Sequence, residues 1–266
     1  MKESIEITAG ECRFCSATLK HKFIDVFLPV TVDTTENHPS DEKGDFQKVS
    51  TFVCSECFLI QKATVSTSTL PEQFHLSAFS SGWLTEMKDY MDQVFEKFEI
   101  TGNTLVTELV DHSESSKGGI RGKNQFFGSS GSYSLADFYG KADQLDGHTE
   151  LANVSDINDF FSGIKSFLSL NGIVTLEFRH LLPILEANQS DISFAGHFPY
   201  FSFTTVDKMV KKHGLEIVDV EECNPTGSLR IYAKHHENLS RKISTRVLFL
   251  RGRERDRGMS SSNFYS

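Results

Sequence analysis

Residues 156–178, DINDFFSGIKSFLSLNGIVTLEF, decide the fold because a helix pattern in them is followed directly by a strand pattern. Apolar side chains recur every three or four residues at the start, which predicts a helix over 156–170 with Asp156 as its N-cap. Asn171 and Gly172 are expected to end that helix. The apolar run IVTLEF that follows predicts a buried strand.

The same alternation continues on both sides of this stretch. Downstream, the pattern predicts a helix over 206–214, a strand over 215–222 and a second strand over 228–235. Upstream, it predicts an amphipathic helix over 84–98 and a strand over 105–110. Strands that alternate with helices predict an α/β fold with a largely parallel sheet covered on both faces, and with an antiparallel final pair of strands.

The first 70 residues have a different character, with β-like runs at 23–32 and 49–53 and two CxxC pairs. The paired cysteines are Cys12, Cys15, Cys54 and Cys57. Each CxxC spacing lets one tight turn direct two thiolates at a tetrahedral ion, and two such turns complete the four-sulfur set that structural zinc prefers. A closed shell of this kind leaves no position for water, so the metal is expected to stabilise the fold without performing chemistry.

Two other interpretations of the cysteines stay open, namely a redox CxxC pair and four unrelated thiols. The absence of a βαβ pattern around either pair weakens the redox interpretation. Cys223 is expected to be a small core residue. His21, His38 and His75 are spare metal ligands in case a cysteine is not used.

Charge and composition exclude several classes of protein. The formal net charge is −9 and the sequence pI is about 5.6, which argues against a protein whose main role is to cover nucleic acid or an anionic membrane. No run of apolar residues reaches the length of a membrane helix, and the start, MKESIEITAG, lacks the apolar core of a signal peptide. We therefore expect a cytoplasmic protein without nucleic-acid or membrane partners.

The run from 156 to 222, DINDFFSG to VDVEE, together with GSLRIYAKH, the CxxC pairs and the segment HLSAFSSGW at 75–83, resembles the bacterial sugar C-methyltransferases. That family methylates a nucleotide-linked keto-deoxysugar with S-adenosylmethionine. The resemblance implies a small N-terminal zinc-binding β unit followed by a reduced Rossmann-like methyltransferase core, with zinc and S-adenosylmethionine as cofactors. The expected divisions are a zinc-binding domain at 1–70, a linking helical segment at 71–100, the core at 101–236, and a basic helix and tail at 237–266.

The resemblance also suggests a catalytic base. In the family a histidine removes the proton next to the sugar ketone, so that the resulting enolate takes the methyl group, and His197 matches that histidine. The supporting polar positions differ: Gly196 stands for a glutamate, Phe194 and His75 each for a tyrosine, and Asn153 for a histidine. A hydrogen-bonded structural histidine is the alternative interpretation of His197.

The cofactor loop departs from the family in a similar way. Glu108 matches the acid at the end of the first core strand, but DHSESSKGGI at 111–120 replaces the acidic glycine-containing loop that follows it. Gly118 and Gly119 are the remaining candidates for a close backbone approach to the cofactor. Two functions therefore remain: a methyltransferase that acts on a nucleotide sugar, and a non-catalytic, zinc-stabilised relative that serves as a binding module.

A final charge cluster lies in the predicted C-terminal helix. Its members are Arg251, Arg253, Arg255 and Arg257, interleaved with Glu254 and Asp256. Alternating charges of this kind are typical of a solvated helix face, so no binding role is predicted for the cluster.

Overall fold

The structure is a computed structural model, and it describes part of the chain. The described residues are 10–29, 46–62, 90, 92–99, 106–108, 141–148, 151, 154, 156–186, 201–223, 227–261 and 264. The chain forms two compact units. The first comprises Met1–Phe74, Arg179–Val206 and Arg251–Ser266, and the second comprises His75–Phe178 and Asp207–Leu250.

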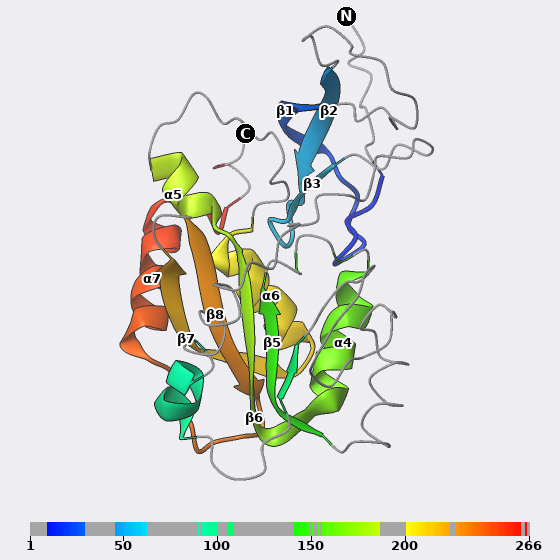
Figure 1. The fold of residues 1–266 in the computed structure, drawn as a ribbon. Coiled ribbons are helices and arrows are strands. Elements are labelled where there is room, and N and C mark those ends of the chain that lie inside the picture. Colours follow the sequence, from blue (N-terminus) through cyan, green and yellow to red (C-terminus); the bar gives the residue numbers. More distant parts are fainter. Residues whose placement is uncertain are drawn as a thin grey trace, which may run out of the picture. The chain divides into compact units, whose positions relative to one another are not determined.

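The second unit is built on a five-stranded sheet (Figure 1) with the strand order β4-β5-β6-β8-β7. Its strands are β4 (Val106–Glu108), β5 (Ala142–His148), β6 (Leu168–Arg179), β7 (Leu215–Cys223) and β8 (Ser228–His235). β4, β5 and β6 are parallel, whereas β7 and β8 pair in the antiparallel sense. The mixed α/β class and the antiparallel final pair predicted from the sequence are confirmed.

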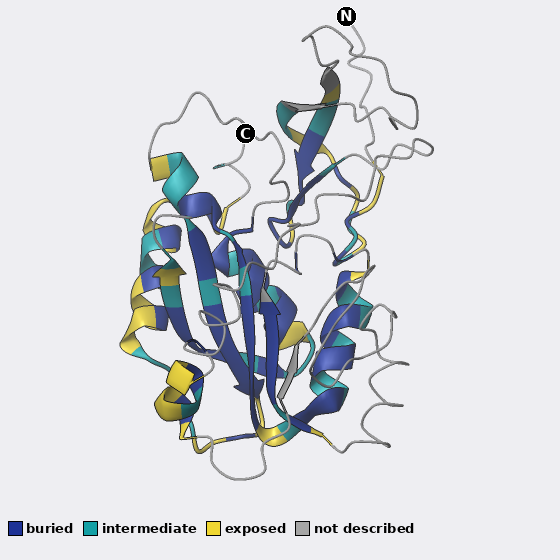
Figure 2. Ribbon diagram, in the orientation of Figure 1, coloured by how far each residue is buried: buried dark blue, intermediate teal, exposed yellow. Residues whose placement is uncertain are grey.

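Two helices follow the predicted pattern on this sheet. Asp156 caps α4 (Ile157–Phe167), because its side chain accepts a hydrogen bond of 2.9 Å from the Asp159 amide. The end of α6 (Phe203–Lys212) lies near α4, because Phe161 of α4 stacks on His213, directly after α6, with ring centroids 5.6 Å apart. Figure 2 shows the strands of the sheet mostly buried, with exposed residues along the outer sides of the helices.

The end of the first predicted helix was wrong. α4 ends at Phe167, and β6 begins immediately at Leu168, so Gly172 lies inside a strand. A Cβ at Gly172 would lie 2.9 Å from the Ala142 carbonyl oxygen, closer than real Cβ atoms come. The glycine therefore serves a close backbone approach between neighbouring strands and does not serve as a helix cap.

The predicted helix over 84–98 is confirmed where the structure describes it, at Tyr90 and residues 92–98. Its buried side chains form a core cluster with residues of three strands. The cluster consists of Tyr90, Val94, Phe98, Ile173, Val218 and Tyr232. The helical spacing of the first three side chains is thus what brings this helix onto the sheet.

The first unit contains a three-stranded antiparallel sheet in the order β1-β2-β3. Its strands are β1 (His21–Pro29), β2 (Phe46–Val53) and β3 (Ile60–Lys62). The unit also contains α5 (Leu181–Glu186). The last helix, α7 (Thr245–Asp256), begins in the second unit and ends in the first. Among the described residues, no helix is both long enough and apolar enough to cross a membrane.

Candidate metal centre and the residues around it

The first CxxC pair lies in a tight turn ahead of β1. The Ser16 amide donates a hydrogen bond of 2.8 Å to the Cys12 carbonyl, and the Cys12 amide donates one of 2.8 Å to the Ala17 carbonyl. Ser16 has a φ of 61°, a left-handed conformation that is unfavourable for a residue with a side chain. The turn therefore reverses the chain sharply just after Cys15.

The second CxxC pair, between β2 and β3, repeats this geometry. The Phe58 amide donates to the Cys54 carbonyl at 2.9 Å, and the Cys54 amide donates to the Leu59 carbonyl at 3.0 Å. Phe58, which follows Cys57 as Ser16 follows Cys15, has a φ of 66°. Two segments with different sequences adopt the same strained turn, and strain of this kind is concentrated at functional sites.

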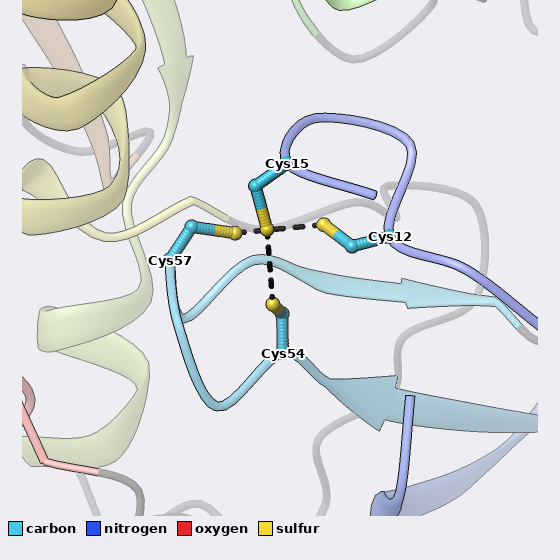
Figure 3. Close-up of side chains that lie close together, drawn as sticks. All are labelled: Cys12, Cys15, Cys54 and Cys57. Carbon is cyan, nitrogen blue, oxygen red and sulfur yellow. Dashed lines mark hydrogen bonds between the residues drawn. The ribbon is translucent and has the colours of Figure 1, made fainter. Parts of the chain in front are cut away.

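The two turns bring all four sulfur atoms together, as Figure 3 shows. The ligand atoms of Cys12, Cys15, Cys54 and Cys57 all lie within 4.8 Å of one another. The Cys12–Cys57 and Cys15–Cys54 sulfur pairs are separated by 3.5 and 3.4 Å. A tetrahedron with zinc–sulfur bonds of 2.3 Å has edges of about 3.8 Å. The spacing of the sulfurs therefore fits a tetrahedral metal ion.

The ionisation of the thiols also favours a cation at this position. Hydrogen bonds from Cys54 and Cys57 hold the pKa of Cys12 far below its usual range. The hydrogen bond to Cys12 raises the pKa of Cys57, and burial raises the pKa of Cys15 to about 11. The ionised form of Cys12 is thus favoured, while ionisation of Cys15 and Cys57 beside it is disfavoured. A bound divalent cation would allow the whole set to ionise at neutral pH.

Outer contacts hold the two turns in place. The Arg13 amide, inside the first turn, donates a hydrogen bond of 3.1 Å to the buried Gln61 side chain on β3, directly beyond the second turn. The Thr205 hydroxyl on α6 donates to the Cys57 carbonyl at 3.1 Å. Partners of this kind orient the ligands of protein metal sites.

Glu254 was wrongly predicted to lie on a solvated helix face. It is 0% exposed, and its Oε1 atom lies 2.9 Å from His180 Nε2. It also accepts hydrogen bonds from the amides of Phe203 and Thr204 and from the Thr204 hydroxyl. Sequence reasoning missed this role because the charge pattern around Glu254 resembles that of an exposed helix. The arginines agree better with the prediction, since Arg253 and Arg257 bind Glu186 near the surface.

Most of the other predicted site residues lie outside the described part of the chain. These are His197, His75, Asn153, Gly118 and Gly119, and the spare ligand His38 is among them too. Glu108 is the last residue of β4, so its backbone lies at the carboxyl end of a parallel strand. The spare ligand His21 lies on β1 and is exposed. Cys223, which was expected in the core, is only half-buried at the end of β7.

Comparison with known proteins gives one informative similarity. No family model matches the chain. The chain is 26% identical over 131 residues to the C-methyltransferase NovU of Streptomyces niveus, an alignment that covers 49% of this chain and 31% of NovU. The chain therefore spans about a third of the length of this relative.

Solved structures with some likeness include magnesium protoporphyrin IX methyltransferase (ChlM) from Synechocystis PCC 6803, at 14% identity and a TM-score of 0.28 over 41% of this chain and 43% of that chain. Another is an S-adenosylmethionine-dependent methyltransferase from Clostridium acetobutylicum, at 10% identity and a TM-score of 0.28 over 36% of this chain and 58% of that chain. The similarity to NovU confirms the predicted resemblance: over the aligned part, this chain is similar to the C-methyltransferases.

Proposed function

We propose that the chain is a reduced, S-adenosylmethionine-dependent C-methyltransferase that acts on a nucleotide-linked keto-deoxysugar. The observation that carries the proposal is the similarity to NovU over 131 residues, about half of this chain. The parallel strands β4, β5 and β6 support it, because open α/β sheets bind their ligands at the carboxyl ends of such strands. Glu108 ends β4 on that side of the sheet.

His197 is the proposed general base. A histidine is suited to this role because its ordinary pKa lies near neutral pH, where the neutral ring accepts a proton from the carbon next to a ketone. Bound S-adenosylmethionine would supply the methyl group. Of the other matched positions, His75 and Asn153 are proposed to line the same site, and Gly118 and Gly119 to approach the cofactor.

Zinc is the proposed resident metal, held by Cys12, Cys15, Cys54 and Cys57. Four thiolates fill the tetrahedral shell, so the ion would stabilise the first unit and would leave no position for a reacting water. This part of the proposal does not depend on methyl transfer.

The test is isothermal titration of the zinc-loaded full chain with S-adenosylmethionine and with S-adenosylhomocysteine. We expect saturable binding with micromolar affinity for both ligands. An absence of binding heat at millimolar ligand would contradict a methyltransferase function. A His197→Asn variant should lose methyl transfer to a nucleotide-linked keto sugar and keep its affinity for S-adenosylmethionine, whereas unchanged turnover would remove His197 from the mechanism.

A second candidate function is that of a non-catalytic relative, a zinc-stabilised binding module. The observation that favours it is the replacement of polar family positions by Gly196 and Phe194, together with the altered segment 111–120. A protein of this kind would retain the zinc and bind neither ligand in the titration. The same experiment therefore separates the two candidates.

A further inference from the structure

Two distant parts of the chain meet beside the start of α6. The Leu181 amide donates a hydrogen bond of 3.0 Å to the Phe201 carbonyl, and the Phe201 amide donates one of 3.1 Å to the Arg179 carbonyl. These bonds join the two ends of the segment 181–200, which begins with α5 and includes His197. We call the residues that join these ends the neck: Arg179–Leu181 and Phe201–Thr204.

Glu254 binds both sides of the neck. Its Oε1 atom lies 2.9 Å from His180 Nε2 on one side and 2.6 Å from the Phe203 amide nitrogen on the other. Its Oε2 atom lies 2.7 Å from both the amide nitrogen and the hydroxyl of Thr204. A carboxylate is suited to this position because it only accepts hydrogen bonds, and because the first turn of a helix favours negative charge.

The first turn of α6 continues this network to the cysteines. The Thr205 amide donates to the Ser202 hydroxyl at 3.0 Å, so the three leading amides of the helix, at Phe203, Thr204 and Thr205, all have acceptors. The Thr205 hydroxyl contacts Ser202 Oγ at 2.8 Å and donates to the Cys57 carbonyl at 3.1 Å. The first turn of α6 therefore links two sets of hydrogen bonds through its backbone, one to Glu254 and one to Cys57 of the metal centre.

We propose that Glu254 is a positioning residue that fixes the neck, and that the bond between Thr205 and Cys57 couples the neck to the metal. When zinc holds Cys57 in place, the Cys57 carbonyl presents a fixed acceptor to Thr205, and the first turn of α6 stays closed around Glu254. When the metal leaves, this acceptor moves and the turn opens more often. This coupling goes beyond the proposed function and does not depend on methyl transfer.

The first test is hydrogen exchange, followed by mass spectrometry, on the full zinc-loaded chain. In Glu254→Gln the shape is kept, but an NH2 group replaces one carboxylate oxygen, so either the Phe203 amide or the Thr204 amide loses its acceptor. We expect the exchange of that amide to be about tenfold faster or more. Exchange within twofold of the parent would overturn the role of Glu254. Should Glu254→Gln not fold, Glu254→Asp, which shortens the side chain by one methylene and draws the carboxylate back from both amides, serves the same comparison.

Glu186→Gln is the matched control for this variant. Glu186 belongs to the same unit and forms ion pairs with Arg253 and Arg257, and these pairs do not involve the start of α6. The same chemical change at Glu186 should leave exchange at residues 203–205 unchanged. An equal acceleration in both variants would mean a general loosening of the unit and would overturn the proposal.

The second test removes the metal with a chelator. In the parent chain, exchange should accelerate about tenfold both at Phe58, in the second CxxC turn, and at residues 203–205. In Thr205→Val, the faster exchange at Phe58 should remain, but exchange at residues 203–205 should no longer respond to the chelator. In Thr205→Ser, which keeps the hydroxyl, the response at residues 203–205 should return. If amide exchange at residues 203–205 of the parent chain did not change when the chelator is added, the coupling would be overturned. No S-adenosylmethionine or sugar is used, so failure of the proposed function and failure of this inference are separate results.

Discussion

At the scale of single residues, the four cysteines are the part of the candidate site that could be predicted from the sequence. Each CxxC spacing is local, and a tight turn that directs two thiols at one point needs few other residues. The strain at Ser16 and Phe58 could not be predicted, because neither residue favours a positive φ. Only the requirement that the sulfurs converge explains why both adopt it.

The metal centre yields a direct prediction at this scale. Cys54→Ser should lower the zinc content from about one ion per chain to a small fraction and destabilise the first unit, because serine is a poor zinc ligand. Cys223→Ser is the control, since Cys223 is half-buried and outside the cluster. Elemental analysis and thermal unfolding measure both effects. A Cys54→Ser protein with full zinc content would refute the four-cysteine site.

Glu254 shows why single residues are harder to predict when their partners are distant. Its partners Phe203 and His180 lie 51 and 74 positions away in the sequence. The local signal, a glutamate among arginines, is the same for a solvated residue and for a buried one. Burying a carboxylate without partners is very unfavourable, so only the tertiary structure, which supplies four donors, makes the position acceptable.

At the scale of secondary structure, a helix boundary could be predicted where the residues that set it are close in the sequence. Asp156 caps α4 through a contact three residues away, which the sequence shows directly. α6 begins at Phe203, ahead of its apolar pattern at 206–214, because Ser202 and Glu254 satisfy its first amides. Ser202 was a local signal, whereas Glu254 was not.

The cap of α4 can be tested by Asp156→Ala. Loss of the side-chain acceptor leaves the Asp159 amide without its partner, and we expect the free energy of unfolding to fall by about 1 kcal/mol. Asp159→Ala, in the same turn, removes a similar charge without removing the cap. Urea denaturation of the two variants compares them. An equal loss in both would mean that charge near the helix start matters and that the cap does not.

Alanine substitutions at two glycines test the corrected boundary between α4 and β6. Gly172→Ala places a Cβ against the Ala142 carbonyl inside the sheet, and we expect a loss of about 1 to 3 kcal/mol. Gly252→Ala, inside α7, meets nothing within 4 Å, and we expect a gain of up to about 1 kcal/mol from helix propensity. Denaturation midpoints measure both. A Gly172→Ala variant with an unchanged denaturation midpoint would show that the backbones of β5 and β6 do not approach closely at this point.

At the scale of the whole molecule, the alternation of helices and strands predicted the α/β class, because each of α4, β6, α6, β7 and β8 has its own periodic signal. β5 gave no such signal, since it carries the buried polar residues Gln144 and Asp146. Those side chains find their partners across the fold: Gln144 binds Thr175, and Asp146 accepts a hydrogen bond from Tyr90. Apolar periodicity cannot predict a strand whose buried polar side chains depend on hydrogen bonds to distant residues.

The stability of the molecule should fall in mild acid because of the buried His235 and the half-buried His213. His235 lies between Lys165 Nζ, 2.8 Å from its Nδ1, and the Leu168 carbonyl, 3.0 Å from its Nε2. Burial lowers the pKa of His235 and also that of His213, so folding favours the neutral form of both rings. In the unfolded chain they take up protons near their ordinary pKa of about 6.5. The neutral rings therefore contribute fully to the free energy of unfolding above that pH, and this contribution is lost progressively as the pH falls below it.

The measurement is the urea midpoint at pH 7.5 and at pH 5.0, and we expect a clear decrease in the parent chain. His235→Gln, whose amide can accept from Lys165 and donate to Leu168, should reduce that decrease. His236→Gln, at the exposed neighbouring position, should leave it unchanged. Loss of metal in acid would affect all three proteins alike, so the difference between variants isolates His235. The Asp219 carboxylate does not interfere, because hydrogen bonds from Arg246 and Lys97 outweigh the effect of its burial and lower its pKa to about 2. A decrease of equal size in all three proteins would show that neutral His235 contributes nothing to the pH dependence.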